Sequence, residues 1–136
     1  MSQEKDNMTT LRKTFDIEAG IDTVWAKISD IGGISKLIGF LQDSELSGED
    51  RVCTLADGGR LEEKIISVDA DLHRVLYSIT SSPLNMSFHV ASMELEPTQD
   101  GTRFIWTTDI QPSQAAAQFE PMLDMACEDM QTTLVN

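Results

Sequence analysis

Residues 112–136 read PSQAAAQFEPMLDMACEDMQTTLVN, and their apolar members recur with the spacing of one helix face. The intervals are three, one, three, one, three and four across Phe119, Met122, Leu123, Ala126, Cys127, Met130 and Leu134. Asp124 and Glu128 are like charges at i and i+4, which weakens an isolated helix. We therefore predict a long C-terminal helix that is held by packing against the rest of the chain.

Pro121 interrupts this pattern. A proline inside a helix costs about 3 kcal/mol, whereas it costs little in the first turn. We therefore predict that the main helix begins near Glu120-Pro121 and is roughly 22 Å long. Residues 113–119 are then a separate turn or a kinked lead-in.

The region before this helix is typical of strands. Residues 9–17 alternate in polarity, two short helical segments follow at 23–30 and 34–38, and turn residues then divide the chain into short apolar runs. Six further strands are predicted at 40–46, 51–56, 60–68, 73–80, 86–96 and 103–110. Because each connection is short, we expect an antiparallel meander.

Two strands have irregular patterns. In residues 86–96 the apolar phase runs through Phe88 and Val90 and then shifts by one to Met93, which predicts a β-bulge. In the first strand, Lys13 lies on the apolar face. Its amine either snorkels to the surface or reaches into a pocket.

Composition limits the class of protein. A chain of 136 residues fits one domain, which we place at 9–136 behind a disordered tail at 1–8. No apolar run reaches the ~18 residues of a membrane span. The net charge of −13 repels nucleic-acid phosphates and anionic membranes. The polar N-terminus has no signal-peptide core, so we expect a cytoplasmic protein.

Cysteines and histidines are few. Cys53 and Cys127 lie far apart, so a disulfide framework is not expected. His73 and His89 have no partner at metal-ligand spacing, and no phosphate-binding glycine motif is present. We therefore expect neither a metal nor a cofactor.

Four stretches resemble one superfamily in order and spacing. They are Ile17-Glu18-Ala19 followed by Val24-Trp25, Val52 to Leu55 with Gly58-Gly59 and the run from Glu63 to Asp69, Arg74 to Ser78, and Gly101-Thr102 with Trp106. They resemble the SRPBCC superfamily, which includes START-like domains, polyketide cyclase/dehydrase-like proteins and plant abscisic-acid receptors. The resemblance covers residues 9–136.

The resemblance implies an α+β helix-grip fold. In this fold a curved seven-stranded antiparallel sheet wraps around a long C-terminal helix, two short helices follow the first strand, and a cavity lies between sheet and helix. The chain departs from the superfamily pattern at Cys53, where many relatives have arginine, and at Gly20, where many have proline. The resemblance therefore does not extend to a specific ligand.

Glu63 is the main candidate for a functional residue. It shares a strand phase with Leu61 and Ile65, which would point it into the cavity, where an acidic group could act in catalysis or bind a ligand. If instead Ile66 and Val68 mark the inward phase, Glu63 is solvated. The resemblance favours the cavity, because the matching glutamate lines the pocket of the abscisic-acid receptors. We then expect Glu63→Gln to change affinity or rate with little loss of stability.

Five further residues are candidate ligand contacts. Tyr77 and Trp106 combine an apolar body with a polar tip, although ordinary core packing explains them equally well. Phe88 stands where the receptors have an aromatic pocket residue. Met93 and Met122 would form adaptable parts of the wall, or simply core.

Three functions fit these features. The first is binding of a hydrophobic small molecule, such as a lipid, a polyketide or an aromatic metabolite, in the cavity between sheet and helix. The second is a cyclase or dehydratase that uses Glu63 in the same cavity. The third is a regulatory or interaction module without turnover. A homodimer through an edge strand or exposed methionines is compatible with each.

Overall fold

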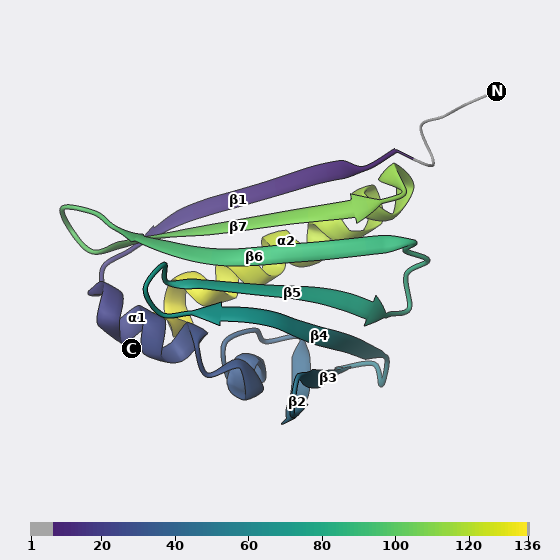
Figure 1. Cartoon of the computed structure of the whole chain (residues 1–136), viewed down its shortest axis with the longest axis horizontal. Coiled ribbons are helices and arrows are strands. Elements are labelled where there is room, and N and C mark those ends of the chain that lie inside the picture. The colour runs from purple at the N-terminus through teal and green to yellow at the C-terminus, as the bar shows by residue number, and fades with distance from the viewer. Residues whose placement is uncertain (1–6, 136) are drawn as a thin grey trace.

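Seven antiparallel strands curve around a long C-terminal helix in the structure, a computed structural model that describes residues 7–135 (Figure 1). The elements in chain order are β1 (Thr9–Ile17), α1 (Ile21–Ile28), the 3₁₀ helix η2 (Ile31–Lys36), β2 (Leu41–Ser47), β3 (Asp50–Leu55), β4 (Arg60–Asp69), β5 (Arg74–Ser81), β6 (Phe88–Pro97), β7 (Thr102–Gln111) and α2 (Ser113–Thr133). This is the helix-grip fold predicted from the sequence. Most of the predicted tail, residues 1–6, lies outside the described residues.

The sheet order is β1-β7-β6-β5-β4-β3-β2. Strands β2 to β7 form the predicted meander, and β1 pairs antiparallel with β7. Strands β1 and β2 follow each other among the strands of the chain but lie at opposite edges of the sheet, so α1 and η2 span the distance between them (Figure 1). No helix within residues 7–135 is long and apolar enough to cross a membrane.

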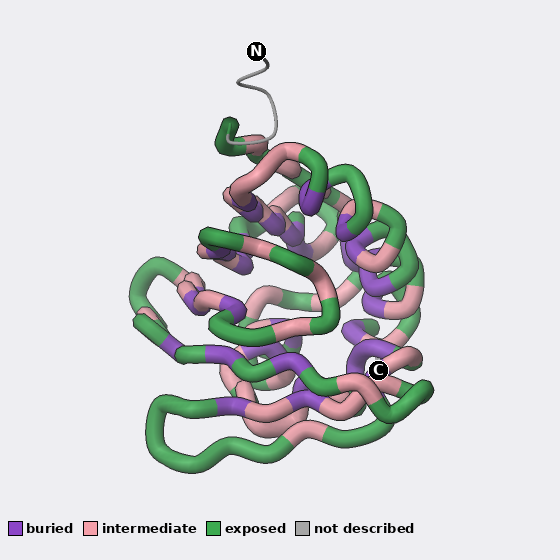
Figure 2. The backbone as a smooth tube through the Cα atoms, turned by 90° about the vertical axis from the view of Figure 1, so that its right-hand side faces the viewer, coloured by how far each residue is buried: buried purple, intermediate pink, exposed green. Residues whose placement is uncertain are grey.

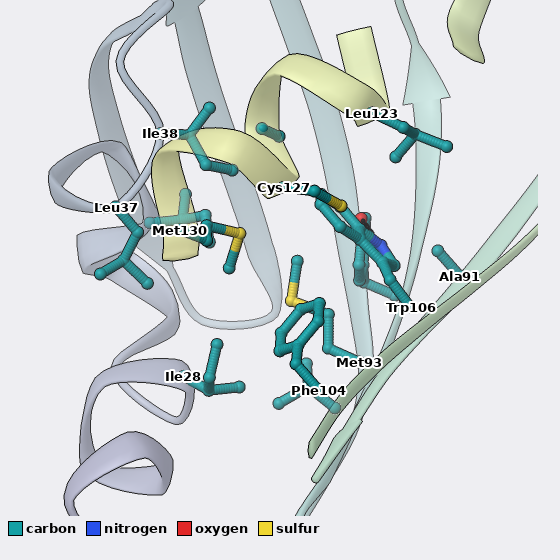
Figure 3. Packing of buried hydrophobic residues seen from close by; sticks show 14 of the residues in the cluster. Ile28, Leu37, Ile38, Ala91, Met93, Phe104, Trp106, Leu123, Cys127 and Met130 are labelled. Atoms are coloured by element: carbon teal, nitrogen blue, oxygen red, sulfur yellow. Dashed lines mark hydrogen bonds between the residues drawn. The ribbon is translucent and has the colours of Figure 1, made fainter. Parts of the chain in front are cut away.

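The core lies between the concave face of the sheet and one face of α2. Buried and exposed positions alternate along the strands, and α2 is buried on one side (Figure 2). Leu123, Cys127 and Met130 of α2 point toward Met93 and Trp106 of the sheet (Figure 3). The predicted apolar face of this helix is therefore the face that packs.

Helix α2 runs unbroken from Ser113 to Thr133, so the predicted start near Glu120-Pro121 was wrong. Pro121 is exposed, and so is Ala117, whose carbonyl oxygen would normally accept a hydrogen bond from residue 121. Because this carbonyl group faces solvent, water can satisfy it. Burial of the apolar face on both sides of Pro121, from Ala115 to Met130, then outweighs the lost hydrogen bond.

The bulge predicted near Val90 is also absent, because the pairing of β6 with β7 is continuous from Phe88 to Pro97. The inner phase of β6 contains His89 and Ala91, a polar and a small residue, whereas Phe88 lies on the outer phase. The sequence pattern predicts the opposite for this end of the strand, because its large apolar residues are Phe88 and Val90. Irregularities occur instead in the pairing of β2 with β3 and at two places between β4 and β5.

Lys13 joins β1 to α2. Its Nζ lies 2.7 Å from Glu120 Oε2 and 2.9 Å from Asp124 Oδ1. The hydrogen bond to Glu120 is the main cause that raises the pKa of Lys13. The amine of Lys13 therefore snorkels to the surface, which was the first of the two alternatives, rather than reaching into a pocket.

The start of β7 is fixed against the end of β1 by a close backbone approach. A Cβ atom on Gly101 would lie 2.1 Å from the carbonyl oxygen of Ile17. The neighbouring Thr102 is fully buried, and its hydroxyl donates a 2.7 Å hydrogen bond to the carbonyl oxygen of Ala19. Gly101 and Thr102 thus set the point where the chain leaves β1 for α1.

Gly101→Ala is therefore expected to destabilise the protein by about 2 kcal/mol, since the added methyl group meets backbone that cannot move aside cheaply. Urea unfolding followed by circular dichroism measures this loss. Gly20→Ala is the matched control, because a Cβ atom there has nothing within 4 Å. Equal stability losses in the two variants would contradict the role given to Gly101.

Candidate functional site

A small cavity lies between the concave face of the sheet and α2. Its volume is about 40 Å³, and side chains from the η2–β2 segment, strands β2 to β7 and α2 line it. Most of these side chains are apolar. The polar members come from β3, β4, β5 and β7, and they are Arg51, Cys53, Glu63, Tyr77 and Trp106.

Arg51 and Glu63 form an ion pair inside this wall. The register of the β3–β4 hairpin places the two residues opposite each other. Arg51 Nε donates to Glu63 Oε1 across 2.6 Å, and the side chains are only 4% and 5% exposed. Arg51 Nη1 also donates to the carbonyl oxygen of Ile31 at 2.9 Å. Because both charges are desolvated, the pair depends on this geometry.

The inward position of Glu63 agrees with the phase shared by Leu61 and Ile65, which are buried with it. Ile66 and Val68, which marked the alternative phase, are 52% and 44% exposed. An irregularity between Ile65 and Ser67 separates the two phases. The predicted orientation of Glu63 is therefore confirmed, while its role in binding or catalysis stays a prediction.

Arg51 was missed by the sequence analysis. The usable signal was the alternation of β3, in which Arg51 shares its face with Cys53. A buried thiol at Cys53 therefore implies an inward guanidinium two residues earlier.

Tyr77 and Trp106 form the adjoining polar contact. Trp106 Nε1 donates to the hydroxyl oxygen of Tyr77 at 3.1 Å, and the Arg51 guanidinium lies 5.2 Å from the centre of the Tyr77 ring. Burial, followed by the charge of Glu63, raises the pKa of the Tyr77 hydroxyl. The hydroxyl therefore stays protonated, and having accepted from Trp106 it can donate its hydrogen to an oxygen in the cavity.

The side chain of Cys53 is a protonated thiol, which is a poor nucleophile. Burial, followed by the charge of Glu63, raises its pKa to about 12. Its Sγ lies 3.5 Å from Glu63 Oε1, as a weak donor. Cys127 is also buried and free, and burial raises its pKa to about 11. Thiolate chemistry is unfavourable at both positions, because the thiolate is the reactive form.

The remaining predicted contacts divide into two groups. Met93 and Met122 line the cavity together with Tyr77 and Trp106. Phe88 does not: it lies on the outer phase of β6 and is 46% exposed. The prediction that Phe88 lines the pocket was therefore wrong. As with the predicted bulge, the reason is that the inner phase of β6 contains His89 and Ala91.

The cavity is small compared with known ligand sites. About 40 Å³ holds roughly three water molecules, whereas sites for drug-sized ligands measure about 300–1,000 Å³. The partly exposed lining residues Phe40 and Met122 mark the side nearest solvent. Unbranched methionines adapt easily to new neighbours, so this wall is suited to expansion. Within residues 7–135 no cluster of His, Cys, Asp or Glu side chains is placed to hold a metal ion.

These features define the class of protein. A curved seven-stranded sheet that grips a C-terminal helix around a partly polar cavity is the architecture of the SRPBCC superfamily. Residues 8–135 match the sequence profile of the family described as polyketide cyclase / dehydrase and lipid transport, and the chain belongs to this family. No curated protein matches the chain.

Solved structures share the fold at low sequence identity. An uncharacterised protein from Bacillus thuringiensis is 17% identical with a TM-score of 0.83, over 96% of this chain and 100% of that one. The Zhui aromatase/cyclase from Streptomyces is 13% identical with a TM-score of 0.74, over 94% and 92%. Norcoclaurine synthase from Thalictrum flavum, in complex with dopamine and hydroxybenzaldehyde, is 15% identical with a TM-score of 0.72, over 93% and 86%.

Because Arg51 and Glu63 form an ion pair, the stability losses caused by substituting each of them should be strongly non-additive. Arg51→Met or Glu63→Met alone should cost about 3–5 kcal/mol of stability, because each leaves one buried charge unpaired. The double variant should be within about 1 kcal/mol of the wild type, since two apolar side chains replace the pair. Urea unfolding of the four proteins checks this, and additive losses would contradict it. The small stability loss expected for Glu63→Gln from the sequence is revised for the same reason, because Arg51 loses its counter-charge.

His89, whose ring centre lies 5.8 Å from that of Tyr77, predicts an acid-dependent loss of stability. Burial lowers its pKa to about 4 in the folded protein, against about 6.5 when unfolded. The imidazole therefore stays neutral in the folded state while the unfolded chain takes up a proton. The contribution of His89 to the free energy of unfolding is complete above pH 6.5. It falls by about 3 kcal/mol as the pH decreases to 4.

Urea unfolding of the wild type and His89→Asn at several pH values isolates this contribution from that of the many carboxylates. The difference in unfolding free energy between the two proteins should shrink between pH 6.5 and pH 4. Parallel curves over this range would show that His89 takes up its proton in the folded protein as easily as in the unfolded chain.

Proposed function

We propose that this protein binds a hydrophobic small molecule in the cavity between the sheet and α2. The class of ligand is a lipid, a polyketide or an aromatic metabolite that carries an oxygen function. Arg51, Glu63 and Tyr77 orient this oxygen, and Met93, Trp106, Met122 and other apolar lining residues contact the body of the ligand. The family, which is named for polyketide cyclases, dehydrases and lipid transport, supports this class.

The observation that carries the proposal is the buried Arg51–Glu63 pair in an otherwise apolar cavity wall. Such a pair contributes little net stability compared with apolar side chains of similar size. Its position beside the Tyr77 hydroxyl instead resembles the small group of polar atoms that fixes a ligand inside an apolar pocket. The complex of norcoclaurine synthase with two aromatic compounds agrees with an aromatic body.

Binding of a ligand of this size requires the cavity to expand beyond about 40 Å³. Phe40 and Met122, the lining residues nearest solvent, are the side chains that must move for a ligand to enter. The neighbouring backbone is tied to α2, because the Gly39 amide donates to Asp129 Oδ2 at 2.7 Å. Side-chain movement at this entrance therefore costs less than separation of the segment from the helix.

A cyclase or dehydratase in the same cavity is the second candidate. The observation that favours it is a proton donor and a proton acceptor on one wall, the Tyr77 hydroxyl and the Glu63 carboxylate. Glu63 is the candidate acid or base of such an enzyme, as considered from the sequence. Turnover of a linear polyketide that falls about 100-fold or more in Tyr77→Phe would assign the enzyme. Tight binding without turnover would assign the binding protein.

Mass spectrometry of small molecules released on denaturing freshly purified protein is the direct test of binding. A stoichiometric lipid, polyketide or aromatic compound is the expected result. The neutral probe 2-acetyl-6-ethylnaphthalene, titrated by its fluorescence, extends the test to protein that is purified empty. Absence of both a released compound and probe binding would favour the third function, an interaction module with a filled cavity.

Ala126→Val is expected to weaken probe binding at least about tenfold, because two extra carbon atoms enter a cavity of about 40 Å³. Its thermal stability should be kept or raised, as is common when a cavity is filled. Ala117→Val, on the exposed face of the same helix, is the matched control and should bind the probe as the wild type does. Unchanged binding by Ala126→Val would place the probe outside the cavity.

A further inference from the structure

Two buried polar atoms lie outside the Arg51–Glu63 ion pair and form no hydrogen bond with it. Among the described residues, His89 Nε2 and Thr108 Oγ1 have no hydrogen-bonding partner, although the residues are 2% and 0% exposed. A buried donor or hydroxyl without a partner costs about 1–3 kcal/mol, so native proteins rarely keep one. Two such atoms in one region leave hydrogen-bonding capacity there that no described residue uses.

The two residues are neighbours on the concave face of the sheet. His89 on β6 is opposite Ile110 on β7, and Thr108 is opposite Ala91. This register makes His89 and Thr108 diagonal neighbours, with Cα atoms about 7–8 Å apart in an antiparallel pair. They lie where β6 begins and β7 ends, at the end of the sheet where α2 starts (Figure 1).

The hydrogen-bonding character of His89 is fixed by its other nitrogen. The backbone amide of Ile79 donates to His89 Nδ1 at 2.8 Å. The neutral imidazole therefore carries its hydrogen on Nε2, which is a donor. Burial lowers the pKa of His89 to about 4, so this tautomer persists at neutral pH. Thr108 adds a hydroxyl that can donate or accept.

His89 lies against two residues of the cavity wall. The ring centre of His89 lies 5.8 Å from Tyr77 and 6.0 Å from Phe119, and both of these residues line the cavity. Phe119 is preceded on its helix face by the small buried residues Ala115 and Ala116. Because these side chains are small, a change of the Phe119 rotamer would extend the cavity toward His89.

We infer that His89 and Thr108 form a second polar subsite, which receives a neutral ketone or hydroxyl oxygen at the far end of an apolar ligand. This inference rests on the proposed function and deepens it. The ligand then carries two oxygen functions, one that meets the Tyr77 hydroxyl and one that meets His89 Nε2, and its apolar body lies along the cavity. A carboxylate does not fit the second subsite, because a neutral imidazole and a hydroxyl supply no charge to compensate its desolvation.

Two neutral probes of the same shape test the subsite: 2,6-diacetylnaphthalene, and 2-acetyl-6-ethylnaphthalene, which lacks the second carbonyl group. The wild type should bind the diketone about tenfold more tightly than the monoketone. This preference should disappear in His89→Asn, which keeps an acceptor for the Ile79 amide, and in Thr108→Val, which keeps the shape of the side chain. Affinity for the monoketone, which can place its carbonyl group beside Tyr77, should change little.

Imidazole nitrogen NMR gives an independent readout, since the chain has only two histidines and His73→Gln assigns the remaining signals. The Nε2 proton of His89 should shift downfield with the diketone and stay in place with the monoketone. Thr108→Val should also raise the Tm of the empty protein by about 4 °C, because it removes an unpartnered hydroxyl. A lower Tm would show that a bound water already satisfies the pair, which would overturn the inference.

The outcomes separate this inference from the proposed function. Equal affinity for the two probes in the wild type, or a preference that survives both substitutions, overturns the subsite and leaves the binding function standing. Failure of both probes to bind the wild type, with no compound released on denaturation, overturns both.

Discussion

Packing of α2 against the concave face of the sheet is the constraint on which the rest of the structure depends. A curved sheet that buries one face needs an element to cover it, and within residues 7–135 only α2 runs the length of this face. The helix meets this demand even though Pro121 removes one of its hydrogen bonds. Since curvature keeps parts of the two surfaces apart, the same packing creates the cavity.

The interior of this protein contains polar groups but carries no net charge. Arg51 and Glu63 cancel each other, His89 is neutral, and the buried thiols and the Tyr77 hydroxyl keep their protons. A chain with a net charge of −13 thus carries its excess charge outside the cavity. Recognition inside therefore relies on hydrogen-bond geometry and shape, which suits neutral oxygen-bearing molecules better than anions.

The fold was largely predictable from the sequence, whereas the site was only half predictable. Alternation and turn residues located the strands, and the position of Glu63 followed from Leu61 and Ile65. Arg51 and His89 were missed as inward residues because periodicity was read from apolar side chains, while both occupy inner positions as polar residues. The same habit placed Phe88 inside. The break predicted in α2 at Pro121 came instead from the general cost of a proline inside a helix, and the exposure of one helix face, a property of the tertiary structure, decided against it.

The pairing of β1 with β7 has a consequence for synthesis of the protein in the cell. Thr9 is opposite Ile110, so the strand made first finds its partner only after almost the entire chain has been translated. At roughly 5–20 residues per second this takes on the order of 5–20 s. During that time β1 has an unpaired edge and an apolar face. A nascent chain of this topology therefore exposes an unpaired strand for longer than a protein whose first strands form a hairpin.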